Sequence, residues 1–225
     1  MPDMPFDETF AAVLFDMDGT LIISEPAIIR AWTAWAIEHD VTAEQLQGFH
    51  GVPTADVVRA VLTAERVPTA LDRINELELA EVEGIVPVPG SVAALAALPD
   101  ERVAIATSCN ERLARARLAA GGVQAPTVVV TVDDVERGKP APDIFLLAAQ
   151  RLGVAAEDCL VVEDAVQGLA AAAAAGMRTL AVTTTTPAEE LRADAVVADL
   201  SAVRFESVEG GVRVTPSAPP PTVTR

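Results

Sequence analysis

Two aspartates lie two residues apart in the run Asp16-Met17-Asp18-Gly19-Thr20, directly after an apolar segment. Side chains two apart on an extended chain point to the same side, so both carboxylates would face one crevice. Like charges this close repel each other unless a cation bridges them or one binds a proton. One aspartate could therefore attack an electrophile while the other transfers protons. The alternative is a solvated acidic turn in which Gly19 supplies the bend.

A segment rich in hydroxyl groups follows a second apolar run, in Thr107-Ser108-Cys109-Asn110. Hydroxyl groups and the backbone N–H groups at the start of a helix bind phosphate oxygens. This segment would therefore hold an anion if it lies beside the aspartates. Taken alone, Thr-Ser before a helix is also an ordinary helix cap.

One lysine and two further acids complete the set of chemical groups. Lys139 stands between Gly138 and Pro140, where a point cation can offset charge on a transferring group. An isolated loop lysine would simply be solvated. Glu163 and Asp164 follow an apolar run, and carboxylate oxygens are the ligands that Mg²⁺ prefers. Acids that stabilise a helix N-terminus are the alternative for this pair.

Short apolar segments rich in Val and Ile recur along the chain, with helical patterns between them. This alternation predicts buried parallel strands joined by crossover helices, which make a doubly wound, Rossmann-like α/β sheet. Such sheets bind ligands at the carboxyl ends of their strands, where the two aspartates, the Thr107 segment and the Glu163-Asp164 pair would lie. Lys139 is expected on a loop before a helix. The predicted strands are 11–15, 103–106, 128–130, 160–162, 180–182 and 196–198.

The interval between the first two strands is too long for a single crossover helix. Helical patterns at 26–39, 54–64 and 70–83 predict an inserted all-helical domain. A hairpin is predicted around Gly210-Gly211. The predicted organisation is an α/β core of residues 1–22 and 88–215, a helical domain of residues 23–87 and a disordered, proline-rich tail of residues 216–225.

Taken in order, the four motifs resemble those of the haloacid dehalogenase superfamily, whose phosphatases open with Asp-x-Asp-Gly-Thr. The resemblance spans the chain except for its tail. It implies that Asp16 is the nucleophile and Asp18 the general acid and base. It also implies that Thr107 and Lys139 hold the phosphoryl group. The implied reaction is hydrolysis of a phosphate monoester through an aspartyl-phosphate intermediate.

The resemblance further implies a Mg²⁺ ion held by Asp16, Asp18, Glu163 and Asp164. In the family the second acid of the Glu-Asp pair binds the metal directly, and the first often acts through water. Asp164 is therefore the stronger ligand candidate of the two.

By the same resemblance, the inserted helices form a cap that closes over the phosphate and reads the leaving group. The expected substrate contacts are Thr20, Glu25, His50, Gly51, Ser108 and Asn110. The amino-acid sequence of the cap resembles those of bacterial sugar and hexitol phosphatases. It also resembles those of glycerol-3-phosphate and 2-deoxyglucose-6-phosphate phosphatases. This implies a small phosphorylated sugar or polyol as substrate. Ile23 stands where the family more often has Asp, so no role of that Asp is carried over.

Two other functions are compatible with this fold. A sugar phosphomutase of the same superfamily is one, but such mutases carry a cap histidine near Ile28 and a basic residue near Thr54, and neither is present. A binding protein without activity is the other. A dehalogenase would lack the acid at Asp18, so that residue favours phosphoryl chemistry.

The composition of the chain disfavours some classes of binding partner. A formal net charge of -17 and a pI of about 4.4 disfavour binding to nucleic acid and to anionic membranes. Cys109 and Cys159 are far apart and lack the spacing of a zinc site or disulfide framework, which fits a reducing compartment. No export signal or membrane span is recognised in the sequence. We therefore expect a cytoplasmic monomer whose partner is its small phosphorylated substrate.

Overall fold

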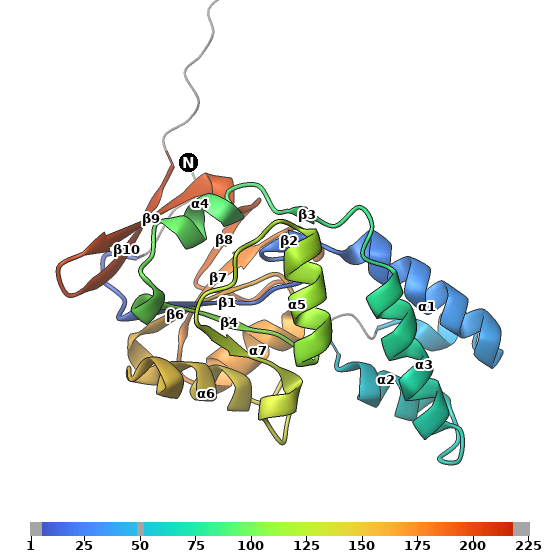
Figure 1. The fold of residues 1–225 in the computed structure, drawn as a ribbon. Helices are drawn as coiled ribbons and strands as arrows, with labels where there is room; N and C mark the ends of the chain where they lie inside the picture. The colour runs from blue at the N-terminus through green and yellow to red at the C-terminus, as the bar shows by residue number, and fades with distance from the viewer. Residues whose placement is uncertain (1–5, 49–51, 218–225) are drawn as a thin grey trace, which may run out of the picture.

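The computed structural model describes residues 6–48 and 52–217. Its centre is a six-stranded parallel sheet with the strand order β5-β4-β1-β6-β7-β8 (Figure 1). The strands are β1 (Ala12–Phe15), β4 (Val103–Ala106), β5 (Val128–Val130), β6 (Cys159–Glu163), β7 (Arg178–Val182) and β8 (Ala195–Val197). Each predicted apolar run forms one of these strands. The predicted doubly wound α/β core is confirmed.

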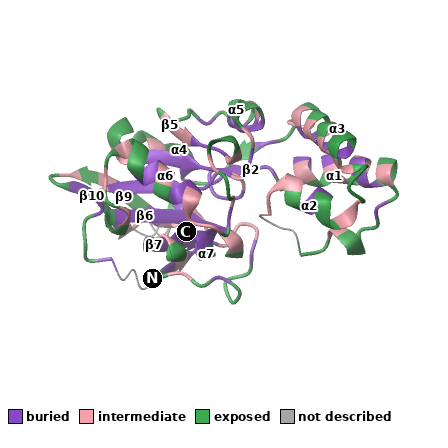
Figure 2. Cartoon of the chain, turned by 90° about the horizontal axis from the view of Figure 1, so that it is seen from below, coloured by how far each residue is buried: buried purple, intermediate pink, exposed green. Residues whose placement is uncertain are grey.

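Both faces of the sheet are buried, which explains why its strands are almost wholly apolar. Along β1, Val13 and Phe15 join the core on one face, whereas Ala12 and Leu14 join the core on the other. Figure 2 shows the strands as a buried layer inside the α/β part of the molecule. β1 lies between β4 and β6, so its carboxyl end stands where the chain order reverses, the place at which such sheets form their ligand crevice.

Helices flank the sheet on both sides. They are α4 (Ser91–Ala96), α5 (Glu111–Ala120), α6 (Asp143–Leu152) and α7 (Val166–Ala174). Apolar side chains of α4 and α5 pack on the face that contains Phe15, and those of α6 and α7 pack on the face that contains Leu14. Short 3₁₀ turns occupy Glu44–Leu46, Asp100–Arg102, Val132–Asp134, Ala156–Asp158 and Leu200–Ala202.

The inserted segment forms a helical unit with a core of its own. Its helices are α1 (Glu25–His39), α2 (Thr54–Val61) and α3 (Val67–Ala80), on the right of Figure 1. Trp35 is fully buried among them. α3 begins three residues before its predicted start because Pro68 suits the first turn of a helix, where no backbone N–H is needed.

Two short strands join the helical unit to the α/β core. These strands are β2 (Ile22–Ile23) and β3 (Val86–Pro87), and they pair in antiparallel fashion. The chain thus leaves the core and returns to it through one two-stranded ribbon.

The C-terminal hairpin consists of β9 (Val203–Val208) and β10 (Gly211–Pro216). The prediction that the disordered tail begins at residue 216 is wrong at its first residue. Pro216 pairs with Val203 at the end of β10, and the N–H of Ser217 donates to the carbonyl of Ala202. Proline is tolerated at a strand end because no ladder hydrogen bond from its nitrogen is required there. The rest of the predicted tail, residues 218–225, lies outside the described residues.

None of the helices in the described ranges combines the length and the apolar character needed to cross a membrane.

The first prediction concerns the core of the helical unit. The indole Nε1 of Trp35 donates to the carbonyl of Ala70 at 2.8 Å, and its ring is 0% exposed. Trp35→Ala removes this bond and opens a cavity, so the free energy of unfolding should fall by about 3–5 kcal/mol. Urea unfolding followed by circular dichroism measures this. Ile37→Ala, on the same helix but 74% exposed, should change stability by less than about 0.5 kcal/mol. Equal effects of the two variants would contradict a separate core.

Candidate active site

The ends of three adjacent strands bring the predicted chemical residues together. Asp16 follows β1, and its N–H donates to the carbonyl of Val162 on β6 at 2.9 Å. The N–H of Thr107, which follows β4, donates to the carbonyl of Val130 on β5 at 2.9 Å. Glu163 ends β6. Parallel pairing in register therefore carries these groups to one edge of the sheet.

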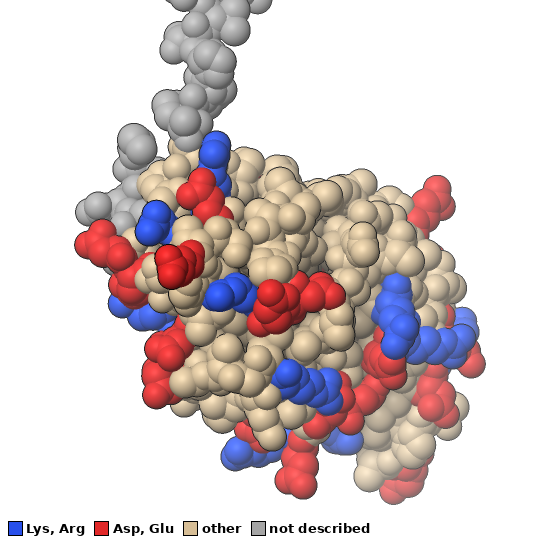
Figure 3. All heavy atoms as spheres, turned by 60° about the vertical axis from the view of Figure 1, so that its left-hand side comes forward, with Lys and Arg blue, Asp and Glu red and all other residues tan. Residues whose placement is uncertain are grey.

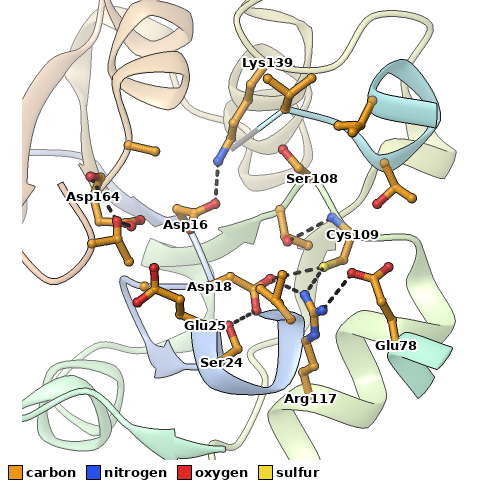
Figure 4. Close-up of a pocket in the computed structure, with 18 of the residues that line it drawn as sticks. Asp16, Asp18, Ser24, Glu25, Glu78, Ser108, Cys109, Arg117, Lys139 and Asp164 are labelled. Carbon is orange, nitrogen blue, oxygen red and sulfur yellow. Dashed lines mark hydrogen bonds and ion pairs between the residues drawn. The ribbon is translucent and has the colours of Figure 1, made fainter. Parts of the chain in front are cut away.

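Lys139 reaches this edge from the loop before α6. Its Nζ lies 2.5 Å from Oδ1 of Asp16 (Figure 4). The same Nζ lies 2.7 Å from Oε1 of Glu163. Burial alone would lower the pKa of Lys139, but the charges of Asp16 and Glu163 outweigh burial and raise it. Lys139 is therefore held as a cation directly beside the Asp16 carboxylate.

Glu163 is fixed in the role of holding Lys139. Its Oε2 accepts the backbone N–H groups of Asp164 and Ala165, each at 2.7 Å. Gly168 makes room for it, since a Cβ there would lie 1.6 Å from Oε1 of Glu163. The sequence predicted Glu163 as a metal ligand. Both of its oxygens have donors and it also lies in an acidic cluster, so this role stays a prediction.

Asp16, Glu163 and Asp164 form an acidic cluster in which one ligand atom from each lies within 4.8 Å of the others. Asp164 accepts a hydrogen bond from the hydroxyl of Thr20 at 3.0 Å and one from Thr185. Burial raises the pKa of Asp164 to about 7, and the charge of Glu163 adds to this effect. Burial also raises the pKa of Asp16, against the opposing charge of Lys139.

These carboxylates need more positive charge than Lys139 supplies if they are to be ionised together. A divalent cation such as Mg²⁺ prefers hard oxygen ligands, and this acidic cluster groups several of them. Asp16 and Asp164 thus have the chemistry to hold such a cation, with Glu163 close by.

The side chain of Asp18 does not belong to this cluster, and its role as a metal ligand stays a prediction. Its Oδ1 accepts from the hydroxyl of Ser24 at 2.5 Å. Its Oδ2 lies 3.1 Å from Cys109 Sγ and 3.1 Å from Arg117 Nη1. Figure 4 shows the carboxylate turned toward Arg117 and away from Asp164. The physical reason is that a guanidinium and two other donors on this side compensate its charge.

A pocket of about 350 Å³ opens over these residues, between the sheet edge and the helical unit. Its floor includes Asp16, Asp18, Thr107 and Lys139. The helical unit supplies a mainly apolar wall, made of Ile28, Ile29, Trp32, Leu46, Val52 and Val57. A small molecule bound to the floor would thus be enclosed by side chains from both parts of the chain.

The electrostatics of the pocket differ from those of the surface. Acidic and basic side chains are interspersed on the face shown in Figure 3, while the whole chain carries a net charge of -17. Lys139 and Arg117 line the pocket and are 4% and 3% exposed. Arg117 is paired with Asp18 and Glu78, so Lys139 is the cation of the two that would contact an anionic ligand, and the field of the whole protein would not attract one.

Only some of the predicted substrate contacts line the pocket. Glu25 and Ser108 line the pocket. Thr20 is fully buried and binds Asp164 instead. The side chain of Asn110 caps α5, accepting from the N–H of Leu113 at 2.9 Å, and is not among the pocket-lining residues. His50 and Gly51 lie outside the described residues.

The pocket residues that sequence reasoning missed include Glu78, Arg117 and Thr185, whose side chains are polar or charged. Arg117 gave a recognisable signal, because it occupies the buried face of α5 with Leu113 and Leu118. An arginine on the apolar stripe of a helix requires a buried partner. Its partners come from distant parts of the sequence, so their identity needed the structure.

The raised pKa of Asp164 predicts a pH dependence of stability in the metal-free protein. An unfolded Asp titrates near pH 4, so between about pH 4 and pH 7 the folded state binds the extra proton. The contribution of Asp164 is therefore greatest at low pH and is lost as pH rises through about 7. Asp164→Asn should raise the melting temperature above that of the wild type at about pH 8, and the difference should vanish toward about pH 4.

Thermal unfolding in a metal chelator measures this difference. Asp72→Asn, at an exposed position on α3, is the matched control and should show no such trend. A constant difference between the Asp164 variant and the wild type across this pH range would contradict the interpretation.

Comparison with known proteins identifies the group to which the chain belongs. A family model described as haloacid dehalogenase-like hydrolase matches residues 10–176. Hexitol phosphatase A of Escherichia coli (strain K12) is 41% identical over 175 residues, covering 75% of this chain and 81% of that protein. Glycerol-1-phosphate phosphohydrolase 2 of Saccharomyces cerevisiae is 35% identical over 193 residues, covering 77% and 75%.

Among solved structures, a hydrolase from Pseudomonas syringae superposes with a TM-score of 0.75 at 27% identity, covering 84% of this chain and 94% of that one. The predicted superfamily resemblance is confirmed by sequence and by fold. With its catalytic-type residues at the ends of β1, β4 and β6, the chain belongs to the haloacid dehalogenase-like hydrolases.

Proposed function

We propose that this chain is a Mg²⁺-dependent phosphatase that hydrolyses small phosphorylated sugars or polyols, with Asp16 as the nucleophile. The observation that carries the proposal is the position of the Asp16 carboxylate. It lies on the floor of the pocket, 2.5 Å from the buried cation Lys139 and within the acidic cluster. A carboxylate held in this way is oriented for attack on an incoming phosphoryl group.

In the first step a carboxylate oxygen of Asp16 attacks phosphorus, and the bond from phosphorus to the leaving oxygen breaks. Asp18 gives its proton to that oxygen, so the product is a free alcohol. Asp16 then carries the phosphoryl group as a mixed anhydride.

In the second step a water molecule attacks phosphorus and gives a proton to Asp18. The bond from phosphorus to Asp16 breaks, phosphate leaves, and both aspartates return to their starting states. Asp18 therefore serves as acid and then as base. Its position on the pocket floor, close to Asp16 in the sequence and in the pocket, supports this role.

The remaining floor residues stabilise charge on the transferring group. Lys139 neutralises a phosphoryl oxygen while it orients Asp16. The hydroxyl of Thr107 accepts from the N–H of Cys109 at 3.2 Å, so its proton is free to point into the pocket toward another phosphoryl oxygen. Asp16 and Asp164 would hold Mg²⁺, which when bound supplies further positive charge at the phosphoryl oxygens.

The proposed substrate class rests on the pocket and on the relatives. The pocket is of the size that suits a small ligand. Two similar proteins bear names that refer to hexitol and glycerol phosphates. We propose that residues 23–87 act as the cap that encloses the alcohol part of such a substrate. Both cysteines are buried and free, which supports the proposed cytoplasmic location.

Asp16→Asn should lower kcat by more than about 1,000-fold, because the amide cannot attack phosphorus or accept the phosphoryl group. Phosphate release from a panel of hexose, pentose, polyol and glycerol phosphates measures it. The control Asp72→Asn replaces an exposed aspartate on α3 and should leave kcat unchanged. An Asp16 variant that retains a tenth of the wild-type kcat would exclude Asp16 as the nucleophile.

Removal of Mg²⁺ by a chelator should abolish phosphate release, and Mg²⁺ added back should restore it, because the clustered carboxylates need a compensating charge. Full turnover in the chelator would contradict the proposed cofactor. The same panel separates the other functions. A mutase would give an isomeric sugar phosphate without phosphate release, and an inactive binding protein would retain every compound unchanged.

A further inference from the structure

Arg117 occupies a buried position between the α/β core and the helical unit. It lies on α5, and its Nη1 is 3.1 Å from Oδ2 of Asp18. Its Nη2 is 3.1 Å from Oε1 of Glu78, which belongs to α3 of the helical unit. Figure 4 shows the guanidinium between the two carboxylates. One side chain of the core thus joins the proposed acid and base to a helix of the proposed cap.

The side chains of this group are enclosed. Arg117 is 3% exposed and Glu78 is 4% exposed. Cys109 Sγ lies 3.2 Å from Arg117 Nη1 and completes the packing around the guanidinium. Within the described part of the chain, Nε of Arg117 and Oε2 of Glu78 have no hydrogen-bond partner. A buried ion pair with unpaired atoms is a poor source of stability, so stability alone does not account for it.

A second polar contact joins the same two helices. The side-chain amide of Asn110, at the start of α5, donates to Oδ1 of Asn75 on α3 at 3.1 Å. Asn75 and Glu78 are three residues apart and therefore share one face of α3. Two side chains on this face bind α5 through polar groups, a type of contact that water can replace when surfaces separate.

We propose that Arg117 is a positioning residue that fixes the Asp18 carboxylate, and that Glu78 links this position to helix α3 of the cap. The inference rests on the proposed function and deepens it. When α3 lies against α5, Glu78 holds the guanidinium, and the guanidinium holds Asp18 on the pocket floor. When α3 moves away, Arg117 loses one of its two anchors and Asp18 loses its fixed orientation. Asp18, the proposed acid and base, would thus have a fixed orientation when the pocket is enclosed.

The variants Arg117→Gln, Glu78→Gln and the double variant test this link in the full-length chain. Arg117→Gln should lower kcat by about 10- to 100-fold with little change in KM, because general acid–base catalysis contributes about 100- to 10,000-fold and only the orientation of Asp18 is lost. Glu78→Gln should lower kcat less. Arg117→Lys, which keeps the charge but not the fork, should recover part of the loss.

The double variant separates positioning from stability. Arg117→Gln alone leaves Glu78 buried without a cation and should lower the melting temperature. Replacing both removes that uncompensated charge, so the melting temperature should return toward the wild-type value. The value of kcat should stay as low as in Arg117→Gln, because Glu78 acts only through Arg117. Recovery of kcat together with stability, multiplying effects of the two changes, or a rise in KM at unchanged kcat would each overturn the proposal.

The chain offers matched controls. Arg115→Gln is on the same helix and removes an ion pair with Glu111 whose side chains are 79% and 63% exposed. Glu76→Gln is on α3, with its side chain 68% exposed. Neither should change kcat or the melting temperature appreciably.

A wild-type chain that releases no phosphate would contradict the proposed function, and the link between the helices is then decided without activity. Hydrogen exchange of the amides of α3 (Val67–Ala80) is the measurement. Faster exchange in Glu78→Gln than in Glu76→Gln supports the link between α3 and Arg117. Equal exchange in the two variants overturns it.

Discussion

Lys139 is buried between Asp16 and Glu163, and the arrangement of the whole site depends on this one cation. Parallel pairing places three carboxylates at the ends of β1 and β6, close enough for mutual repulsion. Lys139 reduces that repulsion, and the backbone N–H groups beyond β6 hold Glu163 in place. The same grouping that is costly for folding would orient Asp16, the proposed nucleophile, and would give the proposed divalent cation its ligands.

The rest of the fold offsets the free-energy cost of grouping these carboxylates. The sheet is apolar on both faces, and its core lies beneath the site. The helical unit is attached through the β2–β3 ribbon and has its own core around Trp35. The proposed catalytic residues and the proposed cap therefore belong to different parts of the chain. Arg117 is the residue through which the two parts meet beside Asp18.

The six strands and three helices of the insertion could be predicted because their signals are local. Runs of apolar residues and helical periodicity are set by neighbours in the sequence. Asp16, Thr107 and Asp164 could be grouped because strand ends meet at one edge of a parallel sheet. Lys139 lies on a loop, and only the resemblance to the superfamily motifs grouped it with them.

Features that depend on distant contacts could not be predicted in this way. The Asp18 carboxylate turns toward Arg117, which is far away in the sequence, and so it leaves the acidic cluster. Thr20 was predicted to contact the substrate, but its hydroxyl donates to Asp164, which is also far away in the sequence. Pro216 reads as the start of a disordered tail, but pairing with Val203 keeps it in the hairpin.

The most direct test of the central claim is to locate the phosphoryl group during turnover. The enzyme is mixed with Mg²⁺ and a substrate that it hydrolyses. The reaction is quenched in acid, and the protein is digested and analysed by mass spectrometry. The account predicts a peptide that contains Asp16 and carries the mass of one phosphoryl group, with the modification on the Asp16 carboxylate. A phosphoryl group on any other residue of an active enzyme would contradict it.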